Sequence, residues 1–389
     1  MSLRVLHVAT HRHNIGDGAL VAGIHRTLEN DLGVKLQVEP LDVLEHKIRG
    51  ERVMLTADDV TRINRTADLV IIGGGGMIEG GARNTLSGIN FNFDIALLER
   101  FEVPVVFYAL GFNQFRRSVF FHRGKLAQLL ATAHRLGMLF TVRNDGSKAR
   151  LERLLGPLDF VGTVPDPGLY VPTRPRTVPE LREGAFNVVL QLAGDRLQHR
   201  LGGKLSRSVR RLRGRDLLVN LTRVVTELIV QRGAHVVLCP HLLTDLPLLA
   251  ELVMALPNRA LREGCTLSPV LCGAESAPDF FELYRQADLV IGMRGHSAIC
   301  SVGLGTPFIG LATHDKVGGF MTEIGLPEWS VDPRQPDAML QLGERIHEVL
   351  ADPARVCDLF RGKIPGLREQ TLRFHRQIDQ QLAGSAWSR

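Results

Sequence analysis

Residues 287–316 read ADLVIGMRGHSAICSVGLGTPFIGLATHDK, and this stretch decides the fold. An apolar strand at 289–291 runs into a glycine, a helix of small residues follows, and a second apolar strand spans 307–311. Strands that alternate with helices in this way predict βαβ units in a parallel sheet. Ligands of open α/β sheets bind beyond the carboxyl ends of the strands. The side chains at these two ends are Arg294, His296, His314, Asp315 and Lys316.

The first half of the chain repeats this pattern. Its segment ADLVIIGGGG at 67–76 matches ADLVIGMRGH at 287–296, and each is an apolar strand that opens into a glycine-containing turn. Apolar patterning predicts further strands at 4–9, 103–109, 139–142, 160–163, 187–192 and 235–238, and helices at 17–28, 122–136, 216–230 and 336–351. The sequence therefore predicts an α/β protein with two Rossmann-like domains facing each other across a cleft.

The chain has 389 residues, which favours two domains over one core. A segment rich in proline and arginine, VPTRPRTVPELREG at 171–184, interrupts the apolar patterning. We expect an N-terminal domain at 1–172, a linker at 173–186 and a C-terminal domain at 187–368. The remaining segment, 369–389, is expected to be a helix that packs back on the N-terminal domain.

Composition narrows the class of protein. Hydrophobic residues make up 44% of the chain and charged residues 23%, as in ordinary globular proteins. The net charge of +6 favours anionic small molecules or surfaces and does not indicate nucleic acid. The five cysteines form no CxxC pair, which predicts buried, reduced thiols. Without an apparent signal peptide or membrane-spanning run, we expect a cytoplasmic protein, with a peripheral contact at the inner face of the membrane left open.

Two turns in the first half are candidates for ligand contacts. In the run from Asn14 to Asp17, Asp17 is a candidate helix cap, and the free N–H groups of a helix start can also face a ligand. The four glycines at 73–76 let the backbone approach a ligand closely, although tight packing of strand on helix accounts for them as well. Neither a dinucleotide fingerprint nor a P-loop is present.

Cations follow several predicted strands. An arginine at a strand end, as at Arg143, suits a carboxylate or a phosphate, although an ion pair with Asp145 or Asp166 is an alternative explanation. The stronger signal is the close spacing of Arg294 and His296, which combines a fixed cation with a group that titrates near neutral pH. Ser297 and Lys316 are further candidate ligand contacts of this region.

Other signals are weaker. The runs His11-Arg-His13 and Cys239-Pro-His241 lack metal-ligand spacing, so we expect neither a metal nor a cofactor. The run at 295–299 is one residue short of a GxSxG elbow. The basic stretch at 204–215 is typical of a solvated helix face, and a contact with a diphosphate-linked acceptor or an anionic membrane is the alternative.

Together these motifs resemble the polysaccharide pyruvyl transferase family. The resemblance rests on Asn-x-Gly-Asp at 14–17, ADLVI-x-GGG at 67–75, Val-Arg-x-Asp-x-Ser at 142–147, Pro-Asp-Pro at 165–167, Arg-x-His at 294–296 and the strand that ends near Lys316. The chain departs from the family at 109–115, ALGFNQF, where many members carry a Gly-Gln-Gly-Ile-Gly-Pro-like run. It also carries Gly295 where leucine is common.

The resemblance implies a glycosyltransferase-B-like arrangement and transfer of pyruvate from phosphoenolpyruvate to a saccharide as a ketal. It implies that Arg143 and Arg294 hold the anionic groups of the donor and that His296 is the catalytic acid or base. The donor site then comprises Arg143, Arg294, His296, Ser297 and Lys316. We expect a lipid-linked or nucleotide-linked acceptor to contact the first domain at Asn14, Asp17, Gly74, Gly75, Gly76, Glu79 and Asn113.

The residues fit this chemistry independently, because phosphoenolpyruvate carries a carboxylate and a phosphate that several cations would hold. A nucleotide-sugar-dependent glycosyltransferase of the same architecture is the alternative, with Arg294 and Lys316 on a diphosphate. A catalytically silent glycan-binding protein is a third hypothesis. The spacing of the glycines disfavours a Rossmann oxidoreductase. The sequence leaves the oligomeric state open.

Overall fold

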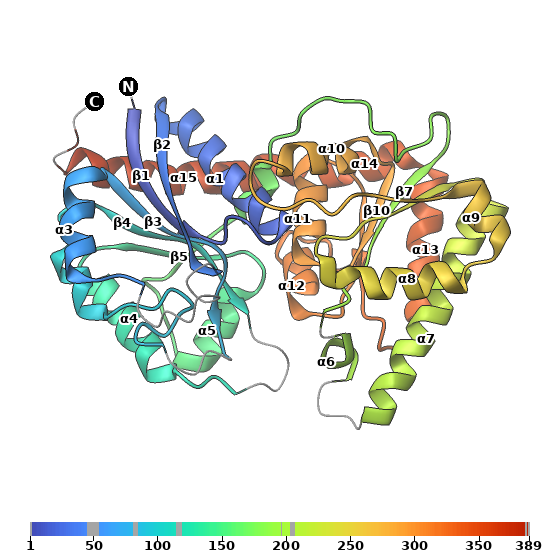
Figure 1. Cartoon of the computed structure of the whole chain (residues 1–389), viewed down its shortest axis with the longest axis horizontal. Coiled ribbons are helices and arrows are strands. Elements are labelled where there is room, and N and C mark those ends of the chain that lie inside the picture. Colours follow the sequence, from blue (N-terminus) through green and yellow to red (C-terminus); the bar gives the residue numbers. More distant parts are fainter. Residues whose placement is uncertain are drawn as a thin grey trace.

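The computed structural model describes residues 2–44, 54–80, 85–113, 119–195, 197–202, 207–385 and 387. Two α/β lobes lie side by side, and each contains a parallel sheet of six strands (Figure 1). Parallel sheets need helices on their faces because the crossover connections run there, which explains why the central strands of both lobes are buried runs. The two-domain α/β architecture predicted from the sequence is therefore confirmed.

The first sheet has the order β2-β1-β3-β4-β5-β6. Its strands are β1 (Ser2–Ala9), β2 (Lys35–Asp42), β3 (Leu69–Glu79), β4 (Val105–Asn113), β5 (Leu139–Arg143) and β6 (Gly162–Val164). Its helices are α1 (Ile15–Leu32), α3 (Ala57–Thr66), α4 (Arg123–Arg135) and α5 (Ser147–Leu155), with short 3₁₀ turns η1 (Ile95–Arg100) and η2 (Pro167–Tyr170).

The second sheet has the order β12-β11-β10-β7-β8-β9. Its strands are β7 (Asn187–Gln191), β8 (His235–Leu238), β9 (Cys265–Leu267), β10 (Leu289–Gly292), β11 (Phe308–Leu311) and β12 (Ser330–Val331). The helices of this half are α6 (Leu197–Gly202), α7 (Arg207–Thr226), α8 (Leu246–Ala255), α9 (Asn258–Gly264), α10 (Ala277–Gln286), α11 (Gly295–Leu304), α12 (Asp315–Glu323), α13 (Ala338–Ala351), α14 (Pro353–Arg361) and α15 (Ile364–Ala383). One turn of π-helix, η3 (Glu227–Gln231), continues α7, and two short 3₁₀ turns are η4 (Leu243–Asp245) and η5 (Pro327–Trp329).

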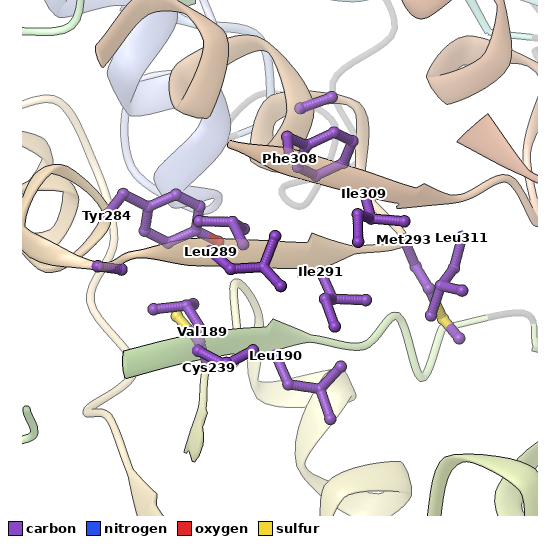
Figure 2. Packing of buried hydrophobic residues seen from close by; sticks show 14 of the residues in the cluster. Val189, Leu190, Cys239, Tyr284, Leu289, Ile291, Met293, Phe308, Ile309 and Leu311 are labelled. Carbon is purple, nitrogen blue, oxygen red and sulfur yellow. The ribbon is translucent and has the colours of Figure 1, made fainter. Parts of the chain in front are cut away.

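Each sheet has a point at which the strand order reverses. The reversal lies between β1 and β3 in the first sheet and between β7 and β10 in the second. Two crossovers leave such a point in opposite directions, and the crevice between them is where α/β proteins bind ligands. The core beneath the second crevice is packed from β7, β10 and β11, and Leu190, Ile291 and Phe308 belong to its single hydrophobic cluster (Figure 2).

The lobes share buried surface. Ile15 and Ala19 of α1 belong to the same hydrophobic cluster as the core of the second lobe. Helix α15 crosses back to the first lobe and ends near the N-terminus (Figure 1). There it places Phe374, Ile378 and Leu382 in one cluster with β1 and α1. The domain limits 1–172 and 187–368 stay a prediction.

A buried polar chain fixes α15 in this position. His375 contacts Asp31 through Nδ1 at 2.6 Å and the Tyr108 hydroxyl through Nε2 at 2.6 Å. Arg368 also donates to Asp31, at 2.8 Å. Burial alone would raise the pKa of Asp31, but the hydrogen bonds from His375 and Arg368 outweigh it and lower that pKa to about 2. The last helix is thus tied to the first sheet by charge as well as by apolar contact.

Three local expectations were wrong. The glycines at 73–76 lie inside β3 and not in a turn after it, and Gly74 has a φ of 82°, which favours glycine. Helix α1 is capped by Asn14, whose side chain accepts from the Gly16 N–H at 2.9 Å, while Asp17 lies in the first turn. Cys272 is exposed, although Cys239 and Cys300 are buried.

Strand β4 contains one residue in an uncommon backbone conformation. Ala109, in β4, has a φ of 51°, the left-handed region that favours glycine. Ala109 is the first residue of the run ALGFNQF at 109–115. Gln114 and Phe115 of this stretch lie outside the described residues, as does Lys204 of the basic stretch. Among the helices that are described, none combines the length and the apolar character needed to cross a membrane.

Candidate active site

A cavity of about 490 Å³ lies between the lobes, at the strand-order reversals of both sheets. The first lobe lines it with Asn14, Asp17, Leu44, Gly76, Glu79, Asn113, Arg143 and Asp145. The second lobe lines it with Asp195, Arg200, His241, Leu242, Met293, Arg294, Gly295, His296, Ile299, His314 and Lys316. Titratable groups dominate both walls, as in sites that bind charged ligands or move protons.

Arg143 is the last residue of β5 and is only 3% exposed. Its Nη1 donates to Asp166 Oδ2 at 2.8 Å, and its Nη2 lies 3.5 Å from Asp145 Oδ2. Burial alone would raise the pKa of Asp166, but the charge of Arg143 outweighs it and holds that pKa well below its usual value. Both ion pairs considered from the sequence are thus present, and they fix a cation in the cavity wall.

His296 comes from the other lobe, in the first turn of α11, and meets Arg143. Arg143 Nη1 lies 3.2 Å from His296 Nε2. Because a guanidinium can only donate, this hydrogen bond requires an Nε2 without a proton, so the neutral ring carries its proton on Nδ1. Asp166 Oδ2 is 3.7 Å from Nε2, and Asp17 Oδ1 is 4.0 Å from Nδ1.

One glycine beside Arg143 and one beside His296 leave the space in which the two side chains come together. A Cβ on Gly111 of β4 would lie 2.6 Å from Cζ of Arg143. A Cβ on Gly16 of α1 would lie 2.7 Å from Cγ of His296. Contacts this short are repulsive. The His296 ring and the Arg143 guanidinium therefore occupy space that a side chain larger than that of glycine would need.

Arg294 is held inside its own lobe. Its Nε donates to Asp245 Oδ2 at 3.0 Å, and its Nη2 contacts both Asp245 and Asp195. Asp195 is shared with Arg200, whose Nη2 lies 3.0 Å from it. The charge of Arg294 is therefore balanced before any ligand binds, although Arg294 lines the cavity beside His296.

Lys316, in the first turn of α12, crosses the cavity toward the first lobe. Its Nζ would lie 3.4 Å from a Cβ on Gly76, next to the side chain of Asn113. Burial, followed by the neighbouring charge of Arg143, lowers the pKa of Lys316 to about 7. In the part of the chain that the structure describes, no carboxylate forms an ion pair with this ammonium.

Nine of the residues predicted from the sequence line the same cavity: Asn14, Asp17, Gly76, Glu79, Asn113, Arg143, Arg294, His296 and Lys316. The other three lie behind the wall. A Cβ on Gly74 would meet Leu20 and Ile24 of α1, and one on Gly75 would come nearest to Asp17 and Thr10. Ser297 is buried and donates to the Arg294 carbonyl at 2.6 Å.

Sequence reasoning missed the roles of four residues. Asp195 and Asp245 balance Arg294, and His241 and Arg200 line the cavity beside them. Asp195 follows the predicted strand at 187–192, so its place at a strand end was a usable signal. His241 follows the predicted strand at 235–238 in the same way, whereas Asp245 and Arg200 carried no such signal. The described residues contain no group of three or more His, Cys, Asp or Glu placed to hold a metal ion.

Solved structures share the architecture. A glycosyltransferase from Rickettsia africae is 11% identical, with a TM-score of 0.58 over 98% of this chain and 99% of that one. The Anabaena protein HepE, crystallised with UDP and glucose, is 12% identical, with a TM-score of 0.55 over 98% and 99%. UDP-GlcNAc 2-epimerase from Neisseria meningitidis, bound to UDP-GlcNAc, is 11% identical, with a TM-score of 0.54 over 99% and 100%. The fold is thus the glycosyltransferase-B type.

Sequence comparison identifies the family. No curated protein sequence matches the chain. The family profile described as polysaccharide pyruvyl transferase matches residues 14–315, which is most of the chain and includes every lining residue of the cavity except Lys316. With the two-lobed fold and the cavity at the strand ends, this match establishes that the chain belongs to the polysaccharide pyruvyl transferase family.

Proposed function

We propose that the protein transfers the pyruvate unit of phosphoenolpyruvate to a saccharide as a ketal and releases phosphate. The observation that carries the proposal is the 3.2 Å contact between Arg143 and His296, one from each lobe, inside a cavity lined by charged groups. Membership of the pyruvyl transferase family supports the class of reaction.

The donor has a carboxylate and a phosphate on adjacent parts of a small molecule, so it needs cations at two points. Arg143 offers a planar guanidinium that suits the carboxylate. Lys316 suits the phosphate, because its ammonium forms no ion pair with a described residue. Arg294 lines the cavity beside His296 and, like Arg143, is paired with two carboxylates of its own lobe, so we assign it as a second guanidinium that faces the donor.

His296 is assigned as the general base. Its Nε2 carries no proton while Arg143 donates to it. When the donor's carboxylate draws the guanidinium away, Nε2 is free to accept the proton of the attacking sugar hydroxyl. Asp166, behind the pair, then stabilises the charged ring across 3.7 Å. General-base help of this kind is worth about 10²–10⁴-fold in rate.

The acceptor is assigned to the first lobe. Asn14, Asp17, Glu79 and Asn113 place two carboxylates and two amides on that wall. Groups of this kind form hydrogen bonds with sugar hydroxyls as donors or acceptors. The cavity of about 490 Å³ falls within the usual range of small-molecule sites. Whether the acceptor sugar is linked to a lipid or to a nucleotide is a question for the assay.

The test is release of phosphate from phosphoenolpyruvate in the presence of lipid-linked and nucleotide-linked sugars. The proposal expects release that depends on both substrates, and a loss of at least about 10²-fold in His296→Ala. A thermal-shift titration gives a second readout, because only a bound ligand raises the melting temperature. Stabilisation by UDP-sugars and none by phosphoenolpyruvate would favour the glycosyltransferase alternative and overturn the proposal.

A further inference from the structure

The proposed reaction leaves one proton without a source. The methylene carbon of phosphoenolpyruvate becomes a methyl group, so an acid in the site must protonate that carbon. His296 is unsuited, because its Nε2 must enter the step without a proton in order to accept that of the sugar hydroxyl. Its other nitrogen faces the backbone at Gly16 and the carboxylate of Asp17 at 4.0 Å. The acid must therefore come from another part of the cavity wall.

Lys316 enters the cavity from a different helix than His296. It is the second residue of α12, shortly after the end of β11, and its ammonium reaches across to Gly76 of β3. Gly76 lines the cavity as well, so Nζ stands at the ligand space. Lys316 lines the same cavity as His296, so both can reach one small substrate.

We propose that Lys316 is the catalytic acid that protonates the methylene carbon of the enolpyruvyl donor, while His296 takes the proton of the sugar hydroxyl. The proposal rests on the proposed function and goes beyond it by dividing the two proton transfers between two residues. Lys316 then touches the donor twice, as a counter-charge for its phosphate before reaction and as a proton source during it.

The step balances as follows. The Nζ–H bond breaks and a C–H bond forms at the methylene carbon, using the π electrons of the enol phosphate. The adjacent carbon becomes an oxocarbenium ion, which the first sugar hydroxyl attacks while its proton passes to His296. The C–O bond to phosphate then breaks, and the second hydroxyl closes the ketal. Of the two hydroxyl protons, one restores the ammonium of Lys316 and the other leaves with phosphate.

The charges around Lys316 make this proton mobile. Burial and the cations Arg143 and Arg150 favour the neutral amine, whereas Asp145 and Asp17 favour the ammonium. In the empty site these influences leave its pKa at about 7. An arriving phosphate adds negative charge beside Nζ and raises that pKa, because opposite charge favours the charged form. At pH 8 the empty protein holds mainly neutral amine, so donor binding should draw in about one proton.

Proton uptake gives a readout that needs no acceptor. Binding of phosphoenolpyruvate is measured by calorimetry at pH 8 in two buffers of different ionisation enthalpy. Wild type should take up about one proton per donor, and His296→Asn should do the same. Lys316→Arg keeps the positive charge but cannot release its proton, so it should bind the donor with little uptake. Lys125→Arg, an exposed lysine on α4, is the matched control and should behave as wild type.

Steady-state kinetics test the proton transfer from Lys316 to the donor. Lys316→Arg should lose at least about 10²-fold in kcat with a KM for the donor within a few-fold of wild type, whereas Lys316→Gln should lose donor affinity as well. Melting temperatures without ligand establish that both variants fold. If Lys316→Arg keeps kcat within about threefold, or keeps the proton uptake, the assignment is wrong. If wild type neither binds the donor nor releases phosphate, the proposed function is wrong, and the assignment of Lys316 fails with it.

Discussion

Replacing Gly111 with alanine tests whether the orientation of Arg143 matters. The new Cβ would lie 2.6 Å from Cζ and 2.7 Å from Nε of the guanidinium, well inside the 3.4 Å at which ordinary contact begins. The backbone of β4 cannot give way easily because it pairs with β3 and β5 on both sides. The guanidinium therefore has to retreat by about 1 Å.

This displacement of the guanidinium lowers both the stability of the fold and the rate of the reaction. Arg143 is 3% exposed and Asp166 is 0% exposed, and the 2.8 Å bond between them is buried. Separating a buried ion pair costs about 3–5 kcal/mol when one charge is left alone, and a partial shift costs a share of that. A misplacement of about 1 Å can lower turnover about 10²-fold. We expect Gly111→Ala to lower the free energy of unfolding by about 1–3 kcal/mol, which corresponds to half of the cost of separating the full ion pair. We also expect it to lower kcat about 10²-fold.

The assay is phosphate release alongside denaturation in urea. Gly343→Ala is the matched control, because Gly343 lies within α13 with no atom within 4 Å of an added Cβ. That variant should gain about 0.5–1 kcal/mol and keep its activity, since alanine is the better helix former. If Gly111→Ala keeps kcat within about threefold, the position of Arg143 does not govern the reaction and the reasoning fails.

Three further outcomes follow from the same geometry. Gly16→Ala should lower kcat about 10-fold or more, because its Cβ would press on His296 at 2.7 Å, and unchanged kinetics would count against the role of that ring. Asp166→Asn should destabilise the fold by about 3 kcal/mol in urea, because it leaves the buried charge of Arg143 without a full partner, and a change below about 0.5 kcal/mol would contradict this. The folded-state pKa of Asp31 is lowered to about 2 from 3.8, so its stabilisation is present above pH 3.8 and is lost as the pH falls toward 2. Asp31→Asn should therefore flatten the acid limb of a stability profile, and an unaltered limb would be the contrary result.

Much of the fold could be predicted because the strands that carry the site are plain apolar runs. The strand expected at 235–238 is β8 (His235–Leu238), and the one expected at 139–142 is β5 with Arg143 added. Strand β2 (Lys35–Asp42) escaped prediction for a physical reason. It lies at the edge of the sheet, half of its side chains are exposed, and it contains Pro40, which only an edge strand tolerates.

The candidate site could also be predicted in part. Strand ends brought Arg143, His296 and Lys316 to one cavity, because parallel strands of a sheet finish at the same edge. The strand end placed Asp195 near the cavity, but its pairing with Arg294 could not be foreseen, and neither could that of Asp245, since the two lie 99 and 49 residues away in the chain. Loops decide such pairings, and loop conformation leaves no periodic signal in a sequence.

The return of α15 to the first lobe means that the chain passes between the lobes twice. A protease that cuts the exposed bond between Arg182 and Glu183 would sever one passage and leave the other intact. The longer fragment would stay bound to the shorter one through Phe374 and Ile378 of α15. It would also keep the hydrogen bond of His375 with the Asp31 carboxylate of the shorter fragment. The nicked protein should migrate as a single species under native conditions, and the two pieces, expressed separately, should assemble into a working whole.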